Sequence, residues 1–389
     1  MNTRQWISGW GTAQQLTPAA VPDESTIKIG NQTVRMVART TVAGRAVRVA
    51  LANSFGMAPV RVASARIASP RIASARIAEP DGGAGGGAHQ LTFAGRPEVT
   101  IPPGACLTSD PVECPVAAQD DLVVSLHVPD QGVIPATHDV GLRTAWLAPG
   151  DQTAAPELDD ATPFRSYLWL TGVDVLAEPA AATVVAFGDS VVDGMETTPG
   201  ADAAWPSVLA RRLAARPDLP PRAVINMGIA GNRILRETDG LGAAGLARFD
   251  RDVLARPGVR WVVLSEGLND LMFGLLPGGE PVTPEDLVAG YRLLIDRAHA
   301  HGIRMIGCTL LPVGGAGIDG LEPLRQDVNR WIRDSGAFDA VVDQDAAVRD
   351  PDDPARVRRD LLAHDGVHPN DEGHRVLAGT VNPELFRTT

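Results

Sequence analysis

The sequence predicts a two-domain protein, in which an all-β domain precedes an α/β domain built on a parallel sheet. The chain has 389 residues, a length that favours two domains. In its first part, short apolar or alternating stretches such as TVRMVARTTV and DLVVSLHV are separated by Gly, Pro, Asn and Asp. From residue 183 onward, apolar strand patterns alternate with longer helical patterns. These two kinds of pattern indicate different fold classes.

Residues 1–176 read as many short strands with turn signals between them and without a long helical period. This pattern is typical of a β-sandwich or a jelly roll. The segment AEPAAA, residues 177–182, reads as a linker. We therefore expect a β domain at 1–176, a linker at 177–182 and a catalytic domain at 183–389.

A repeat interrupts the first half. Residues 61–80 read RVASA RIASP RIASA RIAEP, a five-residue unit repeated four times, and DGGAGGGAH follows. A period of five matches neither a helix nor a strand. We expect a local expansion that lengthens a surface loop or a strand edge. The alternative is an arm that binds a protein partner.

The second half has five apolar strand candidates, and helical patterns lie between them. This spacing predicts a parallel sheet with helices on both faces, whose ligands bind beyond the carboxyl ends of the strands. One helical segment, GLARFDRDVLARP, carries a stripe that we expect to pack on the sheet. The strand candidates are 183–187, 222–226, 259–264, 303–309 and 338–343, and the stripe is Leu246, Phe249, Val253 and Leu254.

Composition narrows the classes of partner. The net charge of −12 argues against a nucleic-acid or anionic-membrane surface, and no apolar run is long enough to span a bilayer. The first residues, MNTRQWISGWGTAQQ, lack an apolar segment followed by a cleavage site. We expect a cytoplasmic protein, or a secreted one whose signal lies outside this sequence. Cys106 and Cys114 are either a disulfide or two thiols, and no cysteine–histidine set has zinc-ligand spacing.

Polar residues follow the strand candidates where a parallel sheet would expose them. Ser190 follows the first strand, Gly231 the second and Asn269 the third. Asp365 and His368 lie in the later segment HDGVHPN. Each stretch alone is more often a turn, a helix cap or a flexible loop. Together they supply the parts of an acyl-transfer site.

The roles follow from the chemistry of the side chains. Ser190 offers a hydroxyl that becomes nucleophilic when a base takes its proton, and His368 can be that base. Asp365 can hold the imidazole tautomer. The N–H groups of Ser190 and Gly231 and the side-chain amide of Asn269 can stabilise an oxyanion. The sequence contains no G-x-S-x-G around Ser190, and no H-E-x-x-H or Walker motif.

These stretches resemble the SGNH, or GDSL, hydrolase family, whose name gives Ser, Gly, Asn and His in this chain order. They fall on GDSVVDG, IAGNR, EGLND and DGVHP, and the Asp of the family's D-x-x-H matches Asp365. The resemblance implies a three-layer α/β/α fold with a five-stranded parallel sheet. It also implies hydrolysis of carboxylic esters without a metal or an organic cofactor. Val191 and Val192 depart from the Leu or Ile and the hydroxyl residue that often follow the serine.

The first half is similar to that of bacterial two-domain members, on the segments WISGWGTA, NQTVRMVARTTVAGRAVRVALANSFG and VTIPPGA. We expect neighbouring polar residues to set the loops: Asp189 and Asp193 near the serine, and Asn232 and Asp270 in the second and third stretches. Glu266 is expected either to contact substrate or to make a structural hydrogen bond.

The substrate that we expect is a small-molecule or carbohydrate ester with a short acyl group. Four tryptophans could stack on sugars, although their default place is the core: Trp6, Trp10, Trp146 and Trp169. A transacylase using the same serine is one alternative, and a glycan-binding module with a spent hydrolase domain is another. The sequence leaves the oligomeric state open.

Overall fold

The computed structural model describes residues 4–15, 27–68 and 88–387. Contacts between residues divide the chain into two compact units, Met1–Pro179 and Ala180–Thr389. Strand β15 (Leu170–Ala177) ends the first unit and strand β16 (Ala182–Gly188) begins the sheet of the second. The linker expected at 177–182 thus includes the last residue of β15 and the first residue of β16.

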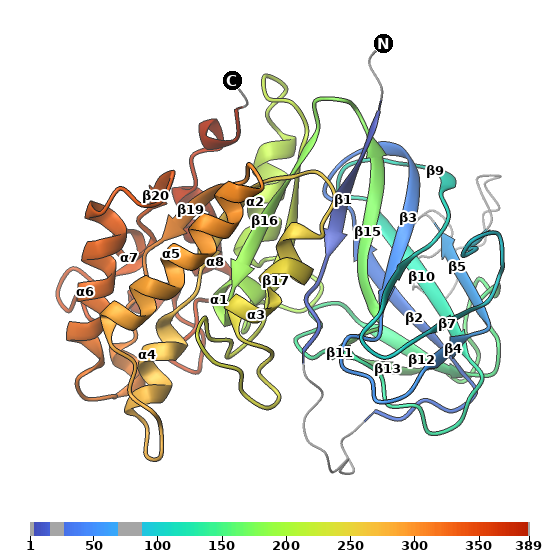
Figure 1. The fold of residues 1–389 in the computed structure, drawn as a ribbon, viewed down its shortest axis with the longest axis horizontal. Coiled ribbons are helices and arrows are strands. Elements are labelled where there is room, and N and C mark those ends of the chain that lie inside the picture. Colours follow the sequence, from blue (N-terminus) through green and yellow to red (C-terminus); the bar gives the residue numbers. More distant parts are fainter. Residues whose placement is uncertain (1–3, 16–26, 69–87, 388–389) are drawn as a thin grey trace. The chain divides into compact units, whose positions relative to one another are not determined.

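The first unit contains antiparallel strands in two larger sheets, as the sequence predicts (Figure 1). One sheet has the order β1-β15-β3-β8, with β9 also paired to β3, and the other has the order β13-β12-β2-β10-β5-β6. Most residues of the central strands β2, β3 and β10 are buried, at consecutive as well as alternate positions. The bounds are β1 Gln5–Gly11, β2 Gln32–Arg39, β3 Gly44–Ala52, β5 Ser64–Ala68, β6 His89–Gln90, β8 Cys106–Thr108, β9 Val112–Val116, β10 Asp121–Val128, β12 Ala145–Pro149 and β13 Thr162–Phe164.

Two further pairs of short strands complete this unit. Strand β4 (Val60–Val62) pairs with β7 (Val99–Ile101), and β11 (Thr137–His138) pairs with β14 (Tyr167–Leu168). Trp169 is fully buried, in agreement with a place in the core, whereas the other three tryptophans named above are partly exposed. Cys106 and Cys114 are both free thiols, the first exposed and the second buried.

The five-residue repeat begins inside this β unit. Residues 61–68 run through β4 and β5, where Val62, Ala65 and Ile67 are fully buried. The expectation for the repeat is a lengthened surface loop or strand edge; over these residues it forms strands, and β5 pairs with β10 on one side and with β6 on the other. Small alanines between the larger side chains let the chain alternate across the sheet. The remainder of the repeat, 69–80, lies outside the described residues.

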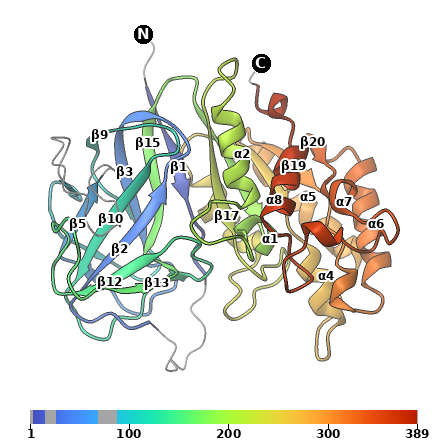
Figure 2. The same ribbon diagram turned by 180° about the vertical axis from the view of Figure 1, so that it is seen from behind.

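The second unit contains the predicted five-stranded parallel sheet, in the order β17-β16-β18-β19-β20. Its strands are β16, β17 (Arg222–Gly228), β18 (Val259–Ser265), β19 (Arg304–Cys308) and β20 (Ala340–Val342). Helices α2 and α8 cover one face, and α3 and α5 cover the other, which makes three layers (Figures 1 and 2). The helices are α1 Ser190–Asp193, α2 Trp205–Ala214, α3 Gly245–Phe249, α4 Leu268–Leu275, α5 Pro284–Ala300, α6 Leu321–Asp334, α7 Gln344–Val348 and α8 Asp371–Thr380.

The sheet is apolar on both faces, as a doubly covered sheet must be. Val184 and Ala186 of β16 point into a cluster with Trp205 and Leu209 of α2, all of them fully buried. On the other face, Phe187 meets Phe249 of α3 edge to face, with 5.5 Å between the ring centroids. Within the described residues, no helix is both long and apolar enough to cross a membrane.

On the helix after β17, the buried side chains are only partly those that the sequence predicts. Phe249 and Val253 are buried as expected, but Leu246 and Leu254 are only partly buried. A π-helical turn follows at Asp250–Leu254, in which the N–H of Ala255 donates to the carbonyl of Asp250. Within this wider turn the helical period changes, so that Asp252 is buried and Leu254 is not; Arg248, before the turn, is also buried.

Gly228, the last residue of β17, allows this strand to approach the loop that follows β16. A Cβ on Gly228 would lie 2.2 Å from the backbone nitrogen of Asp193 and 2.7 Å from its Cα.

We expect Gly228→Ala to lower the free energy of unfolding by about 3 kcal/mol, because backbone atoms must move apart. Gly379→Ala is the matched control, since Gly379 of α8 has nothing within 4 Å of such a Cβ. That change should stabilise by about 0.5 kcal/mol, and calorimetric melting distinguishes the two. Equal effects of the two substitutions would contradict the close approach.

Candidate active site

Ser190, His368 and Asp365 form a chain of hydrogen bonds at the edge of the second unit's sheet. The Oγ atom of Ser190 lies 2.9 Å from Nε2 of His368, and Nδ1 of His368 lies 2.6 Å from Oδ2 of Asp365. These distances are those of a nucleophile, a base and a residue that orients the base. The structure therefore brings together the three residues that the sequence singled out for this arrangement.

Asp365 is held by its own loop. Its second oxygen, Oδ1, accepts hydrogen bonds from the N–H groups of Val367 and His368, both at 3.0 Å. Partial burial opposes ionisation, but the hydrogen bonds from His368 and from these backbone groups outweigh it and keep the pKa of Asp365 below its usual value. Asp365 is thus an ionised acceptor, which fixes the Nδ1–H tautomer of His368 and leaves Nε2 facing the serine.

Ser190 begins the short helix α1, directly after β16. Asp189 caps this helix through a hydrogen bond that its side chain accepts from the N–H of Val191, at 3.1 Å. Burial raises the pKa of Asp189 to about 6. Asp193 accepts a hydrogen bond from the N–H of Ala230, which joins the serine loop to the loop after β17. Both aspartates set loops, as the sequence predicts.

Three hydrogen-bond donors lie at neighbouring strand exits. Within the described residues, the backbone N–H groups of Ser190 and Gly231 have no hydrogen-bond acceptor. Gly231 has φ = +76°, which favours glycine, and a Cβ there would lie 2.8 Å from Leu241. The amide of Asn269 donates one hydrogen bond to the carbonyl of Asn232, at 2.9 Å. An amide nitrogen carries two hydrogens, so a second N–H of Asn269 remains for an oxyanion.

Asn232 and Asp270 hold the loop after β17. The Nδ2 of Asn232 donates to the carbonyls of Leu241 and Ala243, at 2.8 and 2.9 Å. Asp270 accepts from the N–H groups of Ile234 and Leu235, at 2.8 and 2.9 Å. Both side chains are buried and both bond to backbone, so they are loop-setting residues, as expected.

His364, next to the Asp365 loop, contacts the segment that follows Ser190. Its Nδ1 lies 3.1 Å from Oε2 of Glu196, and the imidazole is 87 % exposed. Glu196 has φ = +66°, a conformation that a glutamate rarely adopts. The N–H of Thr198 also donates to Asp371 of α8, at 2.8 Å. These contacts tie the serine loop to the chain segment that carries His368.

Glu266 is a buried carboxylic acid behind the third strand exit. Within the part of the chain that the structure describes, neither carboxyl oxygen has a hydrogen-bond partner. The Nη2 of Arg248 lies 3.7 Å from Oε2, beyond hydrogen-bond distance. Burial raises the pKa of Glu266 to about 8. The side chain thus makes no structural hydrogen bond among the described residues, and a substrate contact stays a prediction.

Arg248 and Tyr291 are two residues near the site that reasoning from the sequence missed. Arg248 donates to the ends of two strands, and the Tyr291 hydroxyl donates to the carbonyl of Glu266, at 2.7 Å. The available signal for Arg248 was an arginine inside an apolar helix with an aspartate four residues later. Tyr291 had no signal, because it sits among the apolar residues of an ordinary amphipathic helix.

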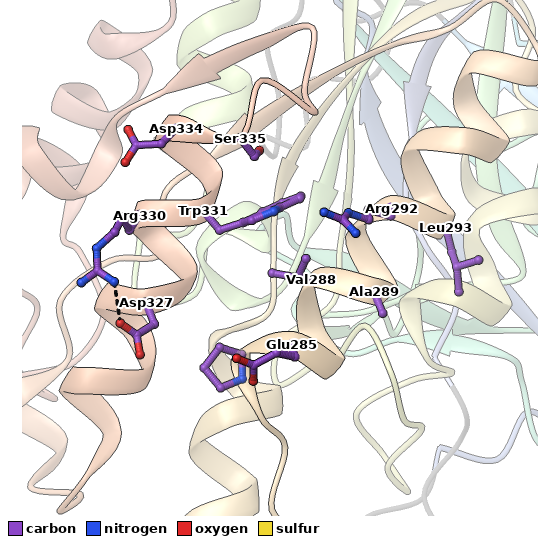
Figure 3. Close-up of a pocket in the computed structure, with 11 residues that line it drawn as sticks. Glu285, Val288, Ala289, Arg292, Leu293, Asp327, Arg330, Trp331, Asp334 and Ser335 are labelled. Carbon is purple, nitrogen blue, oxygen red and sulfur yellow. Dashed lines mark hydrogen bonds and ion pairs between the residues drawn. The ribbon is translucent and has the colours of Figure 1, made fainter.

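A groove of about 960 Å³ lies between α5 and α6, apart from the triad (Figure 3). Trp331 lies in this groove and stacks on Tyr291, with ring centroids 5.9 Å apart and an interplanar angle of 7°. Arg330 and Asp327 pair at its edge, at 2.9 Å. None of the triad or oxyanion residues lines it. The lining residues are Pro284, Glu285, Val288, Ala289, Arg292, Leu293, Asp327, Arg330, Trp331, Asp334 and Ser335.

The raised pKa of Glu266 predicts a loss of stability with rising pH. The unfolded chain ionises this carboxyl near its ordinary pKa of 4.5, whereas the folded protein keeps the proton until about pH 8. The folded state therefore binds the extra proton in this window, and the free energy of unfolding falls as the pH rises through it. Glu266→Gln, which cannot titrate, should lose less stability than the unsubstituted protein between about pH 6 and about pH 8.

Urea unfolding at several pH values measures this difference. Burial also raises the pKa values of Asp189 and Asp270, each to about 6. These two groups therefore lower the free energy of unfolding with rising pH in the unsubstituted protein and in Glu266→Gln alike, and their effect ends near pH 6. If plots of the free energy of unfolding against pH run parallel for the two proteins above about pH 6, a buried, protonated Glu266 is contradicted.

Part of the chain is similar to a known protein family. Residues 186–376 match the model of the GDSL-like lipase/acylhydrolase family. That range contains Ser190, Gly231, Asn269, Asp365 and His368. No curated protein matches the chain.

Several solved structures are similar to the chain at low identity. An acetyl xylan esterase from Geobacillus stearothermophilus is 22% identical, with a TM-score of 0.41, over 54% of this chain and 96% of that one. An α/β-hydrolase enzyme from the metagenome of Lake Arreo is 22% identical, with a TM-score of 0.39, over 54% and 97%. A GDSL-like lipase from Bacteroides thetaiotaomicron is 19% identical, with a TM-score of 0.37, over 51% and 84%.

The family model and the five-stranded parallel sheet that carries its motifs lead to one assignment. The second unit of this chain belongs to the GDSL-like lipase/acylhydrolase family.

Proposed function

We propose that this protein is a serine esterase that hydrolyses carboxylic esters through an acyl-Ser190 intermediate. The observation that carries the proposal is the hydrogen-bond chain from Ser190 through His368 to Asp365, with separations of 2.9 and 2.6 Å. A structural hydrogen bond alone would not need a buried serine, an exposed imidazole loop and free N–H donors at the same strand edge.

In the first step, Nε2 of His368 takes the hydroxyl proton as Oγ of Ser190 attacks the ester carbonyl carbon. The carbonyl oxygen gains the negative charge, and the N–H groups of Ser190 and Gly231 and the free N–H of Asn269 stabilise it. The tetrahedral intermediate collapses as His368 returns the proton to the departing alcohol. Water then attacks the acyl-serine by the same route, which releases the acid and restores Ser190.

The surroundings of the triad support a short acyl group. His368 and Asp365 are partly exposed, with 18 % and 28 % of their side chains accessible. The loop after Ser190 and the loop before His368 present the polar side chains of Glu196 and His364 beside the triad. A long alkyl chain would desolvate these groups without a compensating contact. We therefore propose a small-molecule or carbohydrate ester with a short acyl group as the substrate, and p-nitrophenyl esters of increasing chain length test it.

Asn269→Ala and Ser190→Ala separate charge stabilisation from nucleophilic attack. We expect Asn269→Ala to lower kcat for p-nitrophenyl acetate by roughly 100- to 1000-fold with little change in KM, because the amide acts on the transition state. Ser190→Ala should abolish the covalent route while the protein melts at nearly the same temperature.

Two controls sharpen this experiment. EDTA should leave the rate unchanged, since the proposed mechanism needs no metal. The double variant of Ser190→Ala and His368→Ala should be no slower than Ser190→Ala alone, because the two residues act as a unit. A Ser190→Ala variant with full activity would contradict the proposal.

A further inference from the structure

Arg248 of α3 lies at the centre of the strand exits that carry the proposed site. Its guanidinium is fully buried and donates to the carbonyl of Gly188 at 2.8 Å and to that of Met227 at 2.7 Å. Gly188 ends β16, two residues before Ser190, and Met227 lies in β17, four residues before Gly231. One planar group therefore spans the ends of both strands that lead to backbone oxyanion donors.

The third oxyanion donor is connected to the same guanidinium through Asn232. The Nε of Arg248 donates to Oδ1 of Asn232 at 2.8 Å, and the carbonyl of Asn232 accepts from the amide of Asn269 at 2.9 Å. Asn232 directly follows Gly231 in the chain. A displacement of Arg248 therefore reaches Asn232 through one hydrogen bond, Gly231 through the adjoining backbone, and Asn269 through a second hydrogen bond.

Burying the charged guanidinium of Arg248 removes it from water, which costs free energy. Arg248 lies 3.3 Å from Asp252, which also pairs with Arg251, and its guanidinium carbon lies 3.9 Å above the ring of Phe187. Glu266 faces it without a hydrogen bond. A buried ion pair adds little to stability compared with a well-packed apolar contact, so its stabilising value alone does not account for this arrangement.

Arg325 of α6 shows what a buried arginine with a structural role looks like in the same unit. It is equally buried and bonds to Asp345 at 2.8 Å, to Glu322 at 2.7 Å and to the carbonyl of Leu310 at 2.7 Å. Leu310 follows β19, and none of the three partners belongs to a strand exit that carries a proposed catalytic group. Arg325 is therefore a matched control for Arg248: both are fully buried, but only Arg248 bonds to the strand exits that carry proposed oxyanion donors.

We propose that Arg248 is a positioning residue for the esterase reaction, because its guanidinium fixes the exits of β16 and β17, and through Asn232 also Asn269, at the spacing of the oxyanion hole. This inference rests on the proposed function. Arginine presents several N–H donors in a rigid plane, whereas lysine presents a single point charge. Lysine at this position keeps the charge and loses the simultaneous hold on three acceptors.

The test compares Arg248→Lys with Arg325→Lys, using p-nitrophenyl acetate as the substrate. We expect Arg248→Lys to lower kcat by about 100-fold, since a misplacement of about 1 Å can cost that much, with KM changed by less than about threefold. The affinity for a boronic acid, which forms an anionic adduct with the serine, should fall in proportion to kcat/KM. Arg325→Lys should lower the melting temperature but keep kcat within about threefold.

Calorimetric melting first establishes that each variant is folded at the assay temperature. If Arg248→Lys does not fold, Asn232→Ala takes its place, since it cuts the connection to Asn269 and leaves the bonds of Arg248 to both strands. It should lower kcat by about tenfold or more, by the same misplacement of the oxyanion donors. Folded Arg248→Lys with the kcat of Arg325→Lys, or Asn232→Ala with unchanged kcat, would overturn the inference. An unsubstituted protein without esterase activity would instead overturn the proposed function on which the inference rests.

Discussion

The parallel pairing of β16 with both of its neighbours is the constraint on which the site depends. Gly188 of β16 is in register with Gly228 of β17 and with Ser265 of β18. Because the three strands end at the same level, the loops that follow them begin side by side. Ser190, Gly231 and Asn269 are far apart in sequence, yet this register brings them to one edge of the sheet.

The register would be of little use if side chains kept the strand ends apart. A Cβ on Gly188 would lie 2.1 Å from the carbonyl oxygen of Ser265, and one on Gly228 would meet the backbone of Asp193. Glycine at both strand ends therefore allows the backbone contacts that Arg248 then holds from behind. In the proposed site, close backbone approach and the buried Arg248 together position the three oxyanion donors, and Asp189, Glu266 and Asp270 are buried near them.

Much of this could be predicted from the sequence, for identifiable reasons. The strands of the second unit are nearly continuous apolar runs, which buried parallel strands require, and their ends are marked by glycine followed by polar residues. Ser190 and Asn269 are conspicuous because polar side chains stand just after an apolar run, and His368 because it follows Asp365 by three residues in HDGVHPN. In the first unit, by contrast, β1 and β12 carry weaker patterns, because short antiparallel strands alternate over only a few residues.

Other features could not be predicted, because they depend on contacts between distant segments. The π-helical turn at Asp250–Leu254 changes which side chains of its helix face the sheet, and a period of 3.6 residues predicts the wrong ones. For Glu266 the sequence predicts a substrate contact or a structural hydrogen bond, whereas the packing of α3 and α5 around it removes water and raises its pKa. Tertiary packing, rather than local propensity, decides both cases.

The central claim is that Ser190 is the nucleophile at this strand edge. Mass spectrometry after treatment with a fluorophosphonate tests it most directly, because the reagent bonds covalently to a serine that an adjacent base has activated. The account predicts a single adduct on the peptide that contains Ser190, formed far more slowly when His368 is replaced by alanine. An adduct on another residue, or labelling of Ser190 at an undiminished rate in that variant, would contradict it.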